Sequence, residues 1–172
     1  MISVVKYFLL FLMILVIQVF VLDQAPQLIP YSRPFIFFVF VIAFPDMEAV
    51  WLMALAFAGG LLLDFIYGTP GINASACLLL AYFKVPVIKM FKNSEEENLV
   101  PLAHIVYLGF IRYFFYILVL SFVFQLFSGF LTVFSFSGAG QTIMRAIVNA
   151  LISSILIYIF EIIFFYRRAA RT

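Results

Sequence analysis

The chain has little charge, and this scarcity excludes a soluble fold. Charged residues make up 10% of the 172 residues, whereas hydrophobic residues make up 67% and aromatic residues 20%. A typical soluble domain is about 45–50% apolar and about 25% charged, so a domain of this length could not bury so much apolar surface. Together with a mean hydropathy of +1.22, the composition indicates an integral membrane protein.

Residue types that carry chemistry are also scarce. The single cysteine, Cys77, excludes an internal disulfide and a multi-cysteine metal site. The single histidine, His104, is expected near the inner end of a helix, where a packing role is favoured, and no base can reach Ser135 or Ser137 on the outer side. The sequence has no paired carboxylates for a metal, no phosphate-binding glycine loop and no basic surface for nucleic acid. We therefore expect no enzyme, no metal and no cofactor.

What the chain has is a series of long apolar runs, and about 20 residues suffice for a helix to cross the hydrocarbon core. We predict an all-α integral membrane protein with a single domain over residues 1–172. Its six transmembrane helices are expected at about residues 3–22, 31–44, 49–67, 72–91, 100–127 and 141–166. The apolar part of the second, Phe35–Phe44, is short, so it either borrows residues 31–34 or forms a tilted or partial span. The first is read as a retained helix because no cleavage site precedes Asp23.

Basic residues predict the orientation. Six crossings place both termini on one side, and that side would carry six of seven loop and terminal bases, with only Arg33 opposite: Lys6, Lys89, Lys92, Arg167, Arg168 and Arg171. The positive-inside rule then places both termini in the cytoplasm. Lys84 and Glu161 lie close to the same side, and their side chains are expected to snorkel, so that the charged end of each reaches the cytoplasmic surface.

The fold is predicted to centre on residues 54–86, where two apolar runs meet at the hinge Gly68–Gly71. Small residues and one acid recur every four positions on the first run, at Ala56, Gly60, Asp64 and Gly68. Asn73, Cys77, Ala81 and Lys84 do nearly the same on the second. Such positions share one helix face. Small residues on a membrane helix let a neighbouring backbone approach closely, and a buried carboxylate needs a partner.

Depth in the membrane suggests that partner. At ~1.5 Å per residue, Asp64 lies about 24 Å above the inner edge. Arg145 lies about 6 Å below the outer edge, which is the same height in a ~30 Å core, and Arg112 lies about 18 Å up. We predict that Asp64 pairs with Arg145, or alternatively with Arg112, in a polar pocket that includes Asn73 and Asn149. Helix six carries a polar stripe at Gln141, Arg145, Asn149 and Ser153.

Two functions from different classes remain open on these residues. One is a scaffold that captures a transmembrane helix of a partner on its small-residue faces, expected at Ala54, Ala56, Ala58, Gly60, Gly68, Gly71, Ala74, Ala81, Ala146 and Ala150. The other is a small-molecule carrier with its site near Asp64, Arg145 and Arg112. Composition and periodicity do not separate the two.

The stretch Gly60–Ile72, continued by Asn73–Ala76, resembles the rod shape-determining protein MreD family. That family carries a G-x-x-x-D-x-x-x-x-x-x-G pattern, which matches Gly60, Asp64 and Gly71, before a small-residue helix. Further points of likeness are Arg33-Pro34, the turn at Pro45 and a break at residues 84–86. The overall layout matches along the whole chain, whereas the specific motif covers some thirty residues.

The resemblance implies a non-catalytic scaffold of the cell-wall elongation machinery in the bacterial inner membrane. Its expected partner is MreC, a single-span protein, with MreB, the RodA glycosyltransferase and the elongation transpeptidase further along the assembly. The family is also similar in architecture to the substrate-binding components of energy-coupling-factor vitamin transporters, which keeps the carrier as the alternative.

Overall fold

The computed structural model describes residues 2–20, 34–37, 41, 48–91, 108–134 and 138–162, with side chains from residue 11 onward. These residues form five helices: α1 (Ile2–Phe20), α4 (Ala49–Tyr67), α5 (Ile72–Phe91), α7 (Phe110–Val133) and α8 (Ala139–Glu161). The last four are each long and apolar enough to cross a membrane. In α1, the part with described side chains, Phe11–Phe20, is a shorter apolar helix. The protein is thus an all-α membrane protein, but the expected six spans are not what its described part shows.

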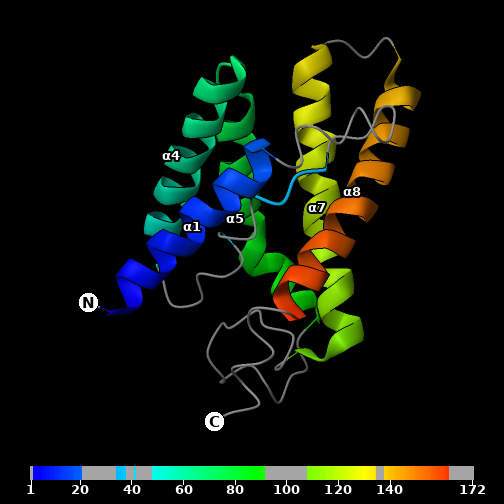
Figure 1. The fold of residues 1–172 in the computed structure, drawn as a ribbon. Coiled ribbons are helices and arrows are strands. Elements are labelled where there is room, and N and C mark those ends of the chain that lie inside the picture. The colour runs from blue at the N-terminus through cyan, green and yellow to red at the C-terminus, as the bar shows by residue number, and fades with distance from the viewer. Residues whose placement is uncertain are drawn as a thin grey trace.

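The four long helices form a row of two hairpins. Close backbone approaches join α4 to α5, α5 to α7, and α7 to α8, so that α4 and α8 lie at opposite ends of the row (Figure 1). Successive helices are antiparallel, and the hinge Gly68–Gly71 lies at the same end of the molecule as the connection between α7 and α8. The other end holds the starts of α1, α4 and α7.

The first hairpin has the bounds expected from the sequence. α4 ends because Gly68 takes a left-handed conformation, with φ 65°, that a residue without Cβ adopts at no steric cost. Its N–H and that of Thr69 both donate to the Asp64 carbonyl oxygen. α5 then continues through Pro86, so the break expected at residues 84–86 does not occur.

The second hairpin is shifted from its expected bounds. α7 begins at Phe110, after Gly109 at φ 75°, whereas a start at Val100 was expected; residues 100–107 lie outside the described part. α7 continues to Val133 and α8 begins at Ala139, so both ends of the predicted connection, residues 128–140, are helical. Polar side chains in this stretch form hydrogen bonds to the helix backbone. Ser128 Oγ donates to the Gln125 carbonyl, and Thr132 Oγ1 donates to the Ser128 carbonyl.

The predicted second span, residues 31–44, is contradicted at residues 34–37. Residues 34–37 are not helical, although Val41 is. This stretch runs through the interior between α1 and the second hairpin (Figure 1), and its four residues are buried. The expected turn at Pro45 and the link around Arg33 lie outside the described residues.

Candidate functional site

The carboxylate of Asp64 acts as the N-terminal cap of the neighbouring helix. The first four backbone N–H groups of an α-helix lack partners within the helix, and a side chain at the N-cap usually accepts from the N–H of the second or third helical residue. The residue before α5 is Gly71, which has no side chain. Asp64 takes that role from α4: Oδ1 accepts from the Asn73 N–H and Oδ2 from the Ala74 N–H, both at 2.9 Å.

Side chains of the hinge complete the shell around Asp64. Oδ1 also accepts from Thr69 Oγ1 at 2.9 Å and from Asn73 Nδ2 at 3.0 Å, and Asn73 Nδ2 reaches Thr69 Oγ1 at 3.1 Å. Asp64 is 4% exposed, so a carboxylate is here removed from water. Four donors and the positive end of the α5 dipole offset that desolvation. The arrangement can hold a helix end in place, and both carboxylate oxygens take part in it.

Gly60 allows this cap to form. A Cβ at Gly60 would lie 2.5 Å from Ala74 Cα and 2.7 Å from the Asn73 carbonyl oxygen. The backbone of α4 therefore touches the first turn of α5 one helical turn before Asp64. The Gly60 and Asp64 positions of the motif work together, because the glycine sets the distance at which the carboxylate meets the two N–H groups.

The partner predicted for Asp64 from membrane depth is wrong. Neither Arg145 nor Arg112 is among the donors to Asp64. Arg145 is exposed on α8, at the far end of the row from α4, and Arg112 is exposed in the first turn of α7, at the end away from the hinge. Asn73 does belong to the Asp64 site, whereas Asn149 is buried on α8.

A second polar cluster, not predicted, surrounds the non-helical residues Pro34–Phe37. Gln18 Oε1 accepts from the N–H groups of Ile36 and Phe37 at 2.8 and 3.3 Å, and its Nε2 donates to the Pro34 carbonyl at 3.3 Å. The Phe35 N–H donates to Ser153 Oγ at 2.8 Å. Backbone that is not helical survives at membrane depth only where protein groups satisfy it. The signal in the sequence was Gln18, an amide within an otherwise apolar run.

Two charged residues expected at the membrane surface are buried instead. Lys84 is 4% exposed, and its Nζ donates to the Val41 carbonyl at 2.8 Å. Glu161 is 1% exposed and lies close to Tyr113 of α7. Both residues lie near the helix end that the sequence predicted for them. Their side chains point into the protein, however, toward the Val41 carbonyl and Tyr113. Snorkelling was therefore the wrong expectation for both.

Most of the small residues predicted to bind a partner are used inside the chain. Those that are buried lie between the helices: Ala56, Gly60, Ala74, Ala81, Ala146 and Ala150. Ala54 and Ala58 on α4 are exposed, as are Gly68 and Gly71 at the hinge. The small-residue faces thus mainly build the two hairpins, and only Ala54 and Ala58 remain as an exposed pair on a helix surface.

Within the described ranges, no three His, Cys, Asp or Glu side chains lie close enough together to hold a metal ion. His104, Ser135 and Ser137 lie outside those ranges. Comparison with known proteins adds no assignment, because no family model, no curated protein and no solved structure matches the chain.

Proposed function

We propose that the chain is a non-catalytic scaffold of the bacterial cell-wall elongation machinery, similar to MreD, that binds the transmembrane helix of an MreC-like protein. MreB, RodA and the elongation transpeptidase would be indirect partners in the inner membrane. The proposal has one structural support: the outer face of α4 presents Ala54 and Ala58, four residues apart and exposed.

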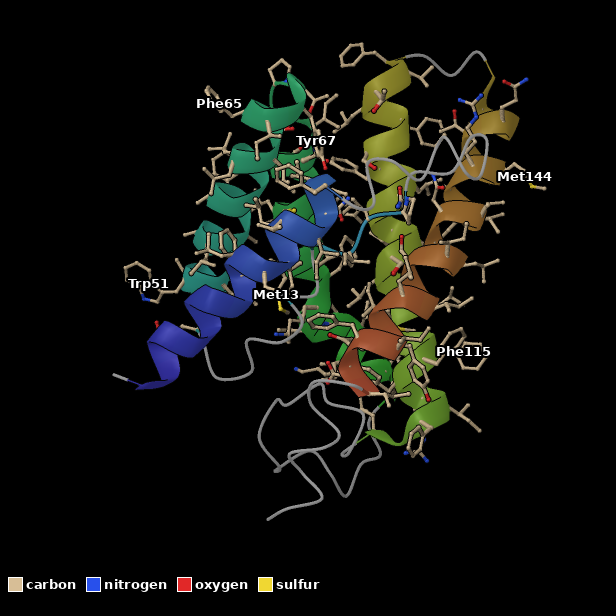
Figure 2. All side chains as sticks on the ribbon, in the orientation of Figure 1. Met13, Trp51, Phe65, Tyr67, Phe115 and Met144 are labelled. Atoms are coloured by element: carbon tan, nitrogen blue, oxygen red, sulfur yellow. The ribbon has the colours of Figure 1, made fainter. Side chains whose placement is uncertain are left out.

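The surroundings of this pair suit a partner helix. Association in lipid depends on close packing, and two small residues spaced by four let a second backbone approach. Trp51 and Phe65 project outward from the ends of α4 (Figure 2), with exposed fractions of 64% and 91%. Large apolar side chains thus stand toward both ends of the small-residue strip formed by Ala54 and Ala58. The capped and closely packed hairpin behind it would hold that strip still.

Ala58→Leu is expected to abolish recovery of the partner by filling the strip. Co-purification of a tagged MreC-like protein from membranes, at equal levels of the inserted variant, measures this. The matched control is Ala49→Leu, the same change at an exposed position of α4 about half a turn away around the helix. If Ala58→Leu and Ala54→Leu are both inserted normally and both recover as much partner as the wild type, the binding surface lies elsewhere.

A carrier of small vitamin-like molecules is the second candidate, and one observation favours it. The non-helical segment and its buried polar neighbours, Gln125, Asn149 and Ser153, lie inside the helices, which is where carriers bind ligands on interrupted helices. A small molecule that stays bound through purification, seen by native mass spectrometry, would favour the carrier over the scaffold.

The proposed orientation, with both termini in the cytoplasm, can be tested with cysteines near the two ends of α5. In a Cys77→Ala background, a cysteine at Pro70 is expected to react with a membrane-impermeant maleimide in spheroplasts. A cysteine at Met90, which is 79% exposed, is expected to react only after permeabilisation. Labelling of the Met90 variant in intact spheroplasts would reverse the orientation.

A further inference from the structure

The non-helical residues Pro34–Phe37 depend on two different helices for their backbone hydrogen bonds. A transmembrane helix satisfies its own N–H groups, whereas these residues cannot. Pro34 has no N–H, and the next three donors are shared between Gln18 on α1 and Ser153 on α8. Each acceptor is buried, at 3% and 0% exposure, so water does not compete with it.

Aromatic contacts run in the same two directions. The Phe37 ring meets Phe11 of α1 edge to face, with centroids 5.3 Å apart. The Phe35 ring stacks on Phe124 of α7, with centroids 4.4 Å apart and planes at 21°. Hydrogen bonds and rings therefore both join the segment to α1 on one side and to the α7–α8 hairpin on the other.

We propose that Pro34–Phe37 is a tie that fixes the position of α1 against the α7–α8 hairpin. The close backbone approaches between described helices run along the row α4–α5–α7–α8, and α1 is not part of that row. α1 contacts the core through side chains such as Ile14 and Phe11. Because lipid supplies no hydrophobic drive between helices, buried polar contacts contribute strongly to where such a helix lies. Three hydrogen bonds join the segment to Gln18 of α1, and the fourth joins it to Ser153 of α8.

Breaking the tie should therefore move α1 and leave the hairpins in place. Without the Gln18 amide or the Ser153 hydroxyl, buried N–H groups of the segment lose their acceptor, and the segment is driven to rearrange until they find another. α1 follows, since it is joined to the segment by Gln18 and Phe37. α7 and α8 also pack directly on each other, so the hairpin has contacts that the segment does not supply.

Distances between spin labels test this directly in the full chain. In a Cys77→Ala background, labels at Leu12 on α1 and Met144 on α8 report the position of α1. Labels at Phe115 and Met144 report the α7–α8 hairpin; all three sites are at least 40% exposed. With Gln18→Leu or Ser153→Ala, we expect the first distribution to shift or broaden by several ångströms and the second to stay unchanged.

Ser154→Ala is the matched control. Ser154 neighbours Ser153, is equally buried, and bonds to Ser121 of α7 and to the Ala150 carbonyl instead of the segment. It should leave the Leu12–Met144 distribution as in the wild type. An unchanged distribution with Ser153→Ala, or an equal broadening with Ser154→Ala, overturns the tie. If Gln18→Leu fails to accumulate, Ser153→Ala decides alone, because it removes one oxygen only.

Discussion

Asp64→Ala is expected to destabilise the protein by about 3 kcal/mol or more, because one buried and three part-buried donors lose a charged acceptor and each unsatisfied buried donor costs about 1–3 kcal/mol. The two backbone N–H groups at Asn73 and Ala74 cannot turn away to find water. Cys77, buried in the next turns of α5, provides the measurement. A thiol-reactive dye reports its exposure as the detergent-solubilised protein is heated, and we expect a clearly lower midpoint for Asp64→Ala.

The same variant separates the cap from an ion pair. If Asp64 neutralised Arg145, then Asp64→Ala with Arg145→Ala would be more stable than Asp64→Ala alone, because removing one partner leaves a buried charge. A cap predicts no such rescue, and Arg145→Ala or Arg112→Ala alone should change the midpoint little. Recovery of stability in the double variant would restore the ion pair and contradict the cap.

Asp64→Asn gives a graded result on the same scale. The amide keeps one oxygen, which can still accept from the Asn73 N–H and Thr69 Oγ1, but its NH₂ group would face the Ala74 N–H, where two donors meet. We therefore expect a midpoint between those of the wild type and Asp64→Ala.

The first hairpin could be predicted from the sequence because its signals are local. A glycine, a threonine, a proline and a second glycine in a row end one helix and start the next, and α4 and α5 begin and end where the sequence placed them. The importance of Asp64 was predictable for the same reason, since an acid in an apolar run demands partners. Its donors, five to ten residues away, were within reach of sequence reasoning as well.

The ion pair was mispredicted because depth is one coordinate of three. Asp64 and Arg145 do lie toward the same end of the helices, but α5 and α7 stand between α4 and α8. The helix–helix order that decides lateral neighbours depends on packing along whole helices. No spacing in the sequence encodes it.

The remaining errors arose where distant residues override a local signal. Ser128 and Gly129 are loop formers by composition, yet a Cβ at Gly129 would lie 3.1 Å from Thr142 Cγ2 of α8, so the glycine serves close helix packing. Residues 34–37 are apolar and would suit a helix. Their non-helical course depends on Gln18 and Ser153, the latter more than a hundred positions away in the chain.

Gly60→Ala is expected to disrupt the first hairpin, although it adds a single methyl group. That group would overlap Ala74 Cα and the Asn73 carbonyl oxygen, which are backbone atoms and cannot rotate aside. α4 and α5 must separate, and overpacking of this kind costs about 1–3 kcal/mol, occasionally more. The separation also lengthens the hydrogen bonds from Asn73 and Ala74 to Asp64, so the loss should approach that of Asp64→Ala.

The matched control is Gly140→Ala, because Gly140 is a helical glycine of α8 with no atom within 4 Å of its added Cβ. There the change should be neutral or stabilise by up to about 1 kcal/mol through the better helix propensity of alanine. Combining Gly60→Ala with Asp64→Ala makes the argument sharper. If the glycine serves the cap, the two losses overlap and their sum exceeds the loss of the double variant. Strictly additive shifts of the Cys77 exposure midpoint would mean that the close approach and the cap stabilise the hairpin independently, and a wild-type midpoint for Gly60→Ala would mean that the helices are not in contact there.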